Sequence, residues 1–468
     1  MRRWILLLSA FLPAAASARV SVLAYGQLSG SGGDLAVSTA APLADGVPGN
    51  RLGGLGSAID YAGCNIFLAL PDRGPNAVAW NPALDDTTSY INRLQTLRMA
   101  LHPAPAGARF PMQVDARLLK TTLLWSATPL VYGSGKGVDA QPGEPMLDAE
   151  RHRYFFTGRS DGFDPAHASD WPADARLDPE SLRLAPDGRR FYLGDEYGPH
   201  LYVFDRATGK RIGVIRLPPG LAVVLPRSTA EAEDRDNRRG RIGNHGLEGL
   251  AITPDGHVLY GALQGALLQD GGAHGGYARL LRIDLRDGKV REYAYPLDRD
   301  GGTAGNPHYS GISEIIAVND HELLVDERGG GGLGNHKPAR VKRIYRVDLA
   351  HARPLGKLSG AVALASRAVH KQLFADLVKM LELHGVAPDR IPEKFEGLAF
   401  GPDVRVHGRP IHTLWISTDN DFLDKVGGHR HAQPGPNPTR FLVLGFDAVD
   451  LPAWAWSRRP RCPSPRAG

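Results

Sequence analysis

Four glutamates recur at similar places in a repeated sequence unit, and their spacing points to one shared chemical site. They are Glu180, Glu248, Glu314 and Glu396, which are 68, 66 and 82 residues apart. If the units are related by rotation about one axis, the four carboxylates converge at one end of that axis. A site that offers only carboxylate oxygens favours Ca²⁺ over Zn²⁺. We therefore expect these glutamates to bind a calcium ion.

Other carboxylates end the second apolar segment of the units: Asp72, Asp195, Glu196, Glu327, Asp419 and Asp421. Carboxylates that lie close together cannot all stay ionised unless they share protons or meet a cation. We expect these side chains near the same end of the axis. The alternative interpretation is structural: each glutamate caps backbone N–H groups or pairs with an arginine, and this duty recurs because the unit recurs.

Two arginines and a histidine are candidates for handling a substrate. Arg73 and Arg328 each follow a carboxylate, in Asp-Arg-Gly and Glu-Arg-Gly. A guanidinium there could bind a phosphate or carboxylate through two N–H groups, or simply pair with the neighbouring acid. His245 could act as a general acid or base near neutral pH, or be an ordinary surface residue. The candidate catalytic residues are therefore His245, Arg73, Arg328 and Asp72.

Short strands joined by turns must position these residues. Five copies of the unit begin near Leu52, Pro179, Leu247, Ile312 and Phe395. Asp-Gly turns at 187–188 and 255–256 supply the positive φ that tight hairpins require. Another strand follows most copies, so each unit has the three or four strands of a propeller blade. With 56 Gly and 36 Pro in 468 residues, the composition is typical of many short strands and turns.

These units predict an all-β fold, a β-propeller with six blades. The least recognisable blade would come from residues 108–157 or from the two termini. The ring would close if a strand near Val20 to Leu28 paired with one near 441–447, because an open blade leaves unpaired edges. Residues 361–384 have apolar side chains at helical spacing and precede Gly385. We expect a helical insertion there.

Several stretches match a known family in order along the chain: DRGPN at 72, LDPESLRLAPDGRRFYLGDEYGP at 177, NHGLEGLAITPDG at 244, GISEIIAVNDHELLVDERGG at 311, FEGLAF at 395 and ISTDNDF at 416. Through them the sequence resembles the phytase-like family of exported bacterial proteins, described by an esterase-like activity of phytase. The resemblance implies a propeller and a hydrolase of ester or phosphoester bonds. Arg151-His152 lacks the Gly-x-Arg-x-Pro context of histidine acid phosphatases, so a phosphohistidine route is not expected.

The N-terminus has the pattern of a secretory signal peptide. Residues 1–18 combine Arg2 and Arg3, an apolar run from Trp4 to Leu12, and the small-residue site Ala16-Ser17-Ala18. Residues 19–468 would then form one mature domain. No later segment offers about 18 uninterrupted apolar residues, so we expect no membrane span and a periplasmic or secreted protein.

Charge and cysteine content narrow the partners and the compartment. The formal charge of +5 is too balanced to favour nucleic acid or a membrane surface. Cys64 and Cys462 are the only cysteines. In an oxidising compartment they could form one disulfide or remain two thiols, and ring closure would bring them together. We expect the disulfide.

The sequence therefore predicts an exported hydrolase that acts on a small-molecule ester or phosphoester. Ca²⁺ at the channel mouth would polarise the substrate and activate water. Hydrolysis of a lactone, a cyclic ester, is an alternative form of this activity. The alternative is a non-catalytic propeller that binds a glycan, a peptide or an envelope partner on the same face.

Overall fold

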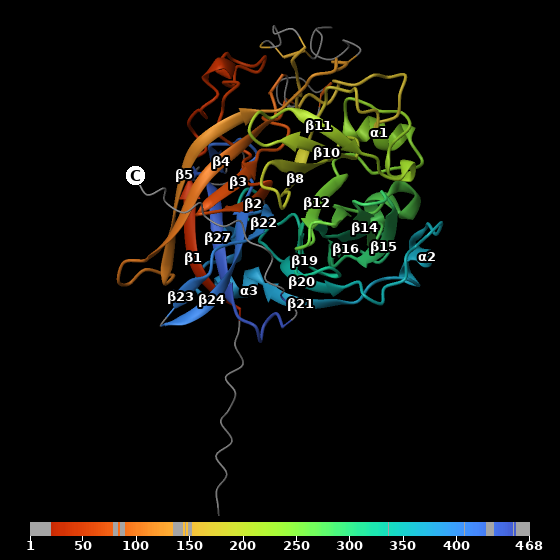
Figure 1. The fold of residues 1–468 in the computed structure, drawn as a ribbon. Helices are drawn as coiled ribbons and strands as arrows, with labels where there is room; N and C mark the ends of the chain where they lie inside the picture. Colours follow the sequence, from red (N-terminus) through yellow and green to blue (C-terminus); the bar gives the residue numbers. More distant parts are fainter. Residues whose placement is uncertain are drawn as a thin grey trace, which may run out of the picture.

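The computed structural model describes residues 20–77, 83–84, 89–133, 144–145, 147, 152–335, 337–406, 408–426, 435–452 and 454. The expected signal peptide at 1–18 and Cys462 lie outside these ranges. Strands dominate the described part of the chain and are arranged as a β-propeller (Figure 1), as predicted. No helix in those ranges is long and apolar enough to cross a membrane.

Five four-stranded blades form the propeller. We number the blades in chain order, and we name the strands of each blade from the innermost to the outermost. Blade 1 contains β2 (Ala58–Gly63), β3 (Ile66–Leu70), β4 (Arg93–Pro103) and β5 (Met112–Leu123). Blade 2 contains β8 (Pro179–Leu184), β9 (Arg190–Asp195), β10 (His200–Asp205) and β11 (Arg211–Ile215). Blade 3 contains β12 (Leu247–Ile252), β13 (Val258–Leu263), β14 (Tyr277–Asp284) and β15 (Val290–Pro296).

The last two blades come from the C-terminal half and from the N-terminal strand. Blade 4 contains β18 (Gly311–Ala317), β19 (Glu322–Arg328), β20 (Lys342–Asp348) and β21 (Lys371–Asp376). Blade 5 contains β22 (Phe395–Phe400), β24 (Arg409–Thr418), β27 (Thr439–Phe446) and β1 (Ser21–Leu28). Shorter elements lie between and beside the blades: β6 (Trp125–Ser126), β7 (Tyr154–Phe155), α1 (Ala230–Asp236), β16 (Arg299–Gly302), β17 (Pro307–Tyr309), β23 (Val404–Val406), β25 (Lys425–Val426) and β26 (Gly435–Pro436).

The innermost strands form a closed ring. β2 packs beside β8, β8 beside β12, β12 beside β18, β18 beside β22, and β22 returns to β2. Within the described ranges there is thus no sixth blade, and the prediction of six is wrong. Both expected sources of a sixth blade belong to other blades. The region 108–157 provides β5, which pairs with β4 along most of its length and completes blade 1, and the strands near the two termini pair within blade 5.

The predicted ring closure is confirmed. β1 pairs antiparallel with β27 from Ser21–Gly445 to Leu28–Thr439, so the first and the last strand share blade 5 (Figure 1). β1 also makes a short parallel pairing with β5 through Ala24 and Tyr25. This pairing joins the outer edges of blades 1 and 5 and covers an edge that would otherwise be open.

The predicted helical insertion is only partly present. Residues 361–384 contain α2 (Ala361–Ala365), the outer strand β21 and α3 (Leu377–Leu383). β21 pairs with β20 and completes blade 4. Asp376 ends the strand and caps the helix, because its side chain accepts a hydrogen bond from the Lys379 N–H. The apolar spacing seen in the sequence combines buried residues of a strand and of a helix.

Cys64 lies in the turn between β2 and β3 and is disulfide-bonded. The only other cysteine in the sequence is Cys462, which falls outside the described residues.

Candidate functional site

β-Bulges in three inner strands place a glutamate at the end of the channel. In β8, β12 and β22 the register with the second strand shifts across Glu180, Glu248 and Glu396. A bulge adds one unpaired residue and re-aims its side chain. These three carboxyl groups are close enough that the charges of Glu248 and Glu396 affect the ionisation of Glu180. Glu180, Glu248 and Glu396 therefore lie near one another.

Glu314 lies elsewhere, and its predicted place beside the other three is wrong. In β18 the register shift falls on Ser313, so Glu314 is one position further along the strand and pairs in register with Asp326. A shift of one residue turns a side chain to the other face of a strand. The Glu314 carboxylate accepts hydrogen bonds from the N–H groups of Leu250 and Ile315 and lies 3.1 Å from Arg183.

Arg183 and Glu314 are buried between the inner strands. The Arg183 guanidinium donates to the carbonyl oxygens of Ile59, Ile315 and Leu398, which belong to β2, β18 and β22. Burial raises the pKa of Glu314 to about 8, although the charge of Arg183 opposes this shift. This pair is structural and lies apart from the acidic groups described next.

The acidic side chains at the channel mouth, which we call the mouth cluster, come from all blades except blade 4: Asp72, Asp178, Glu180, Glu196, Glu248, Glu396, Asp419 and Asp421. The cluster contains two groups of three residues, and within each group the carboxylate oxygens lie within 4.8 Å of one another. One is Asp178, Glu180 and Glu196, and the other is Asp72, Asp419 and Asp421. Asp178 was not among the residues expected from the sequence, although it lies only two positions before Glu180.

Three cationic side chains border the mouth cluster. Arg73 Nη1 lies 2.8 Å from Asp178 and 3.7 Å from Glu196. Arg328 Nη2 lies 2.6 Å from Glu396, and its Nε donates to the hydroxyl of Ser313. The expected pairings of Arg73 with Asp72 and of Arg328 with Glu327 are therefore replaced by contacts with other residues.

The third cation is Lys394, which was not predicted from the sequence. Its Nζ lies 3.2 Å from Asp419, 2.5 Å from Asp421 and 3.8 Å from Glu396. Lys394 precedes β22 directly, so its position beside the FEGLAF motif was the available signal. The group of Asp72, Asp419 and Asp421 thus already holds an ammonium group.

The carboxyl groups of the mouth cluster resist ionisation. Burial, together with the charge of Asp178, raises the pKa of Glu180 well above its ordinary range and that of Glu196 to about 8. Burial and the charges of Glu196 and Glu396 do the same for Glu248. Burial raises the pKa of Asp419 to about 7, although Lys394 opposes it. Each of these carboxyl groups must keep a proton or gain a cation.

The donor set fits a hard divalent cation. Asp178, Glu180 and Glu196 supply three oxygens within bridging distance of one another. Gln264 donates to one carboxylate oxygen of Glu248 at 2.7 Å. The other carboxylate oxygen of Glu248 is buried and has no hydrogen-bond partner among the described residues. All the possible ligand atoms are oxygens. Ca²⁺ prefers oxygen ligands and binds six to eight of them. Glu180 is partly exposed, which leaves room for water or substrate oxygens.

Two of the carboxylates expected at the mouth have structural partners. Asp195 accepts hydrogen bonds from the N–H groups of Asp178 and Gly198, both at 2.9 Å, and so holds the Asp178 backbone in place. Glu327 accepts from the Tyr295 hydroxyl and from Lys371, both at 2.7 Å. The structural interpretation therefore describes Asp195 and Glu327 better than a role as ligands.

His245 precedes Gly246, whose N–H donates to Glu196 at 3.1 Å. Its Nδ1 is 3.1 Å from the Gly243 carbonyl oxygen, which places the proton on Nδ1 and leaves Nε2 able to accept one. Burial lowers the pKa of His245, so the imidazole is neutral near pH 7. Its neighbour Asn244 has a φ of 55°, and the Asn244 side-chain oxygen accepts a hydrogen bond from Arg73.

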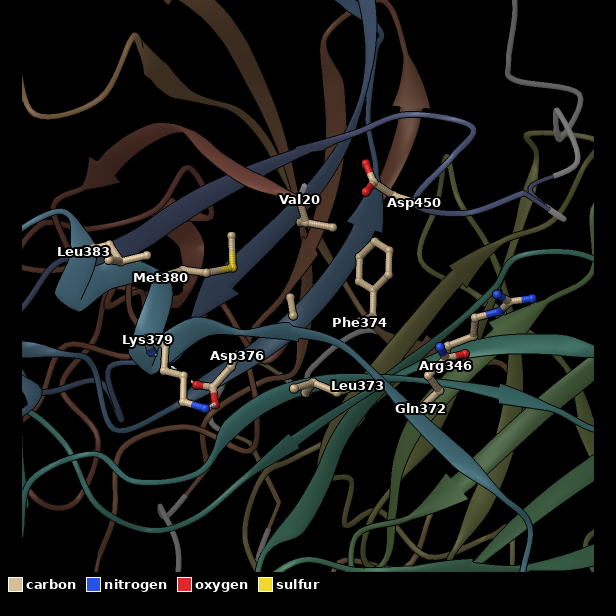
Figure 2. Close-up of a pocket in the computed structure, with 11 residues that line it drawn as sticks. Val20, Arg346, Gln372, Leu373, Phe374, Asp376, Lys379, Met380, Leu383 and Asp450 are labelled. Atoms are coloured by element: carbon tan, nitrogen blue, oxygen red, sulfur yellow. Dashed lines mark hydrogen bonds and ion pairs between the residues drawn. The ribbon is translucent and has the colours of Figure 1, made fainter. Parts of the chain in front are cut away.

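A separate cavity of about 340 Å³ lies on the outside of blade 4 (Figure 2). Phe374, Met380, Val20, Arg346 and Asp450 surround it. It is lined mainly by β21 and α3 and lacks the convergent carboxylates of the mouth cluster. The mouth cluster is therefore the better candidate for chemistry.

Comparisons with known proteins identify the family of this chain. Residues 50–422 match the model of the phytase-like family, described as esterase-like activity of phytase. An uncharacterized secreted protein of Arthroderma benhamiae is 30% identical over 461 residues, which covers 81% of this chain and 84% of that protein. This relative is fungal, so the match does not support the expectation of a specifically bacterial family.

Solved structures show weaker similarity. The PQQ-bound aldose sugar dehydrogenase of Streptomyces coelicolor has a TM-score of 0.34 at 12% identity, over 92% of this chain and 99% of that one. The periplasmic gluconolactonase of Pseudomonas aeruginosa has a TM-score of 0.32 at 13% identity, over 83% and 88%. Neither similarity says anything about the chemistry of this chain.

Proposed function

The chain belongs to the phytase-like family described by an esterase-like activity of phytase, and we propose that it is an exported, calcium-assisted hydrolase of carboxylic or phosphoric esters. The reaction would take place at the mouth cluster. The observation that carries this proposal is the group of Asp178, Glu180 and Glu196, whose oxygens lie within 4.8 Å of one another; Asp178 and Glu196 are buried, and Glu180 is partly exposed.

Asp178, Glu180 and Glu196 would hold the ion, with Glu248 supplying a further oxygen. Bound Ca²⁺ would provide Lewis-acid polarisation of an ester oxygen. The Nε2 of His245 would accept a proton from the attacking water. Water would add to the acyl carbon or the phosphorus, the ester bond would break, and the alcohol would leave with a proton. The guanidinium of Arg328 lies beside Glu396 and would stabilise negative charge that develops on the substrate.

The mature protein is proposed to be periplasmic or secreted. The signal-peptide pattern at 1–18, the secreted relative and the disulfide-bonded Cys64 all support export. N-terminal sequencing of protein recovered from the periplasm or medium should begin within a few residues of Arg19. Intact Met1 on a cytoplasmic protein would contradict this.

Calcium titration and ester turnover test the function directly. Wild-type mature protein should bind Ca²⁺ in calorimetry, and it should hydrolyse 4-nitrophenyl acetate or 4-nitrophenyl phosphate in a way that a chelator abolishes and added Ca²⁺ restores. Glu180→Gln should lose both properties. Glu382→Gln is a matched control, because Glu382 is an exposed residue of α3. Calcium binding without turnover of any ester would favour the non-catalytic binding propeller. No calcium binding to the wild type would overturn the proposal.

A further inference from the structure

A small notch beside the mouth cluster is walled by four arginines. It has a volume of about 20 Å³ and is lined by Arg73, Arg176, Arg227 and Arg241, with hydroxyl groups that include Ser228. We call it the arginine notch. Arg73 also contacts Asp178 at 2.8 Å. One guanidinium therefore borders both the arginine notch and the proposed calcium-binding group.

The inner wall of the notch has more positive than negative charge. Arg176 and Arg241 both bind Glu233, at 3.2 and 2.5 Å, and all three side chains are nearly inaccessible to solvent. Burial alone would raise the pKa of Glu233, but the two guanidinium groups lower it below its ordinary value. Glu233 is thus ionised and pairs with both guanidinium groups, while Asp195 and Glu196 also act on the charge of Arg241. Burial raises the pKa of Asp195 to about 7 and that of Glu196 to about 8, so these two carboxyl groups offset the guanidinium charge only in part, and the wall favours an anionic ligand.

The arginines of the inner wall are held rigidly. The Arg176 guanidinium lies over the rings of Phe163 and Tyr197, at 4.8 and 5.0 Å from their centres, and donates to the Ser160 carbonyl oxygen. Arg241 donates twice to the Tyr197 carbonyl oxygen. Because these groups are already fixed in place, binding a ligand costs little conformational entropy.

The outer wall is open to solvent and is only partly neutralised. The Arg227 side chain is 38% exposed and pairs with Asp236 at 2.8 Å. Asn244, which also lines the notch, is exposed. A volume of 20 Å³ accommodates roughly one oxygen atom, the space of a single water. A ligand could therefore insert one oxygen while the rest of it lies over Arg73 and Asn244, next to the mouth cluster.

Taking the hydrolase function above as its basis, we propose that the arginine notch binds an anionic oxygen group of the substrate. The substrate is then an ester that carries a second acidic group, a phosphate or a carboxylate, near the bond to be cleaved. Arginine suits this task because its planar N–H groups match phosphate and carboxylate oxygens. The notch selects the substrate, whereas the mouth cluster performs the hydrolysis.

Three variants separate the notch from general surface charge. Arg227→Gln removes a guanidinium that lines the notch. Arg235→Gln is the matched control, because Arg235 pairs with the same Asp236 at 3.0 Å but does not line the notch. Arg227→Lys keeps the positive charge. Thermal unfolding of each variant shows whether the fold is intact.

Inorganic phosphate and acetate are the probes, titrated separately into each protein by calorimetry. The wild type should bind at least one of them, and the stronger binder identifies the acidic group. Arg227→Gln should weaken that binding about tenfold, Arg227→Lys should recover part of it, and Arg235→Gln should leave it unchanged. Equal affinity in the wild type and Arg227→Gln, or no binding of either anion at millimolar concentration, would overturn the proposal.

Calcium titration of the same proteins keeps this proposal distinct from the proposed function. Arg227→Gln should bind Ca²⁺ as the wild type does. Anion binding without calcium binding would overturn the calcium-assisted hydrolase and leave the notch standing as a binding site. Calcium-dependent hydrolysis without anion binding would overturn the notch alone.

Discussion

Arg183 and Glu314 form a buried ion pair, 3.1 Å apart, that connects the inner strands of all five blades. Arg183 belongs to β8 and donates to carbonyl oxygens on β2, β18 and β22. Glu314 belongs to β18 and accepts from the Leu250 N–H of β12. This buried pair therefore ties the inner strands of the propeller together.

Arg183→Met is expected to destabilise the fold by about 3–5 kcal/mol, because it leaves the Glu314 carboxyl buried without its partner. Urea unfolding measures the change. Arg190→Met is the control: Arg190 pairs with Asp187 on the surface, and loss of such a pair costs less than about 1 kcal/mol. Equal effects of the two variants would show that the channel pair has no special role.

A second prediction follows from the position of Glu314, which lies one residue beyond the β-bulge and away from the other three glutamates. Glu248→Gln should weaken Ca²⁺ binding more than tenfold, because it removes a charged oxygen from the mouth cluster. Glu314→Gln should leave the calcium affinity unchanged while the protein is folded, since Glu314 faces Arg183. Calorimetry below the unfolding temperature distinguishes them, and equal losses would refute the assignment of the bulge to Ser313.

Lys394 is expected to exclude a second cation. Its ammonium group lies among Asp419, Asp421 and Glu396, where a metal ion would otherwise bind. Lys394→Met should raise the calcium stoichiometry by one, and added Ca²⁺ should then raise the unfolding temperature of the variant more than that of the wild type. Lys394→Arg keeps the charge and should keep the wild-type stoichiometry.

His200 is expected to make the protein sensitive to acid. It is 5% exposed, its ring stacks on Tyr202 at 4.8 Å, and burial with the nearby charge of Arg211 lowers its pKa from 6.5 to about 3. Between these values the unfolded chain binds a proton that the folded chain does not. The His200 contribution to stability is therefore present above pH 6.5 and is lost as the pH falls toward 3, by about 1.4 kcal/mol per pH unit.

His200→Gln removes this titration. The free energy of unfolding of the variant should fall less steeply than that of the wild type between pH 6.5 and 4.5. The exposed His257 supplies the control, because His257→Gln should keep the wild-type slope. Parallel profiles for the wild type and His200→Gln would contradict the prediction.

Much of the architecture could be predicted from local patterns. Each of the five repeated units became one blade, and the strand near Val20 to Leu28 closed the ring with 441–447 because both ends needed a partner. The prediction of six blades was wrong because the sequence of the strand within 108–157 does not show which blade it joins. Only its pairing with β4 assigned it to blade 1.

By itself, the sequence determined which residues could reach the channel mouth: Glu180, Glu248 and Glu396 occur at the same register of related units, so rotation brings them together. The tertiary structure alone decided that a β-bulge falls at this register in each of the four strands, on Ser313 in β18, which turns Glu314 to the other face of its strand. It also decided which charges meet. Arg73 and Asp178 are 105 residues apart, and Arg328 and Glu396 are 68 apart; such pairs form only when blades from distant parts of the chain pack side by side.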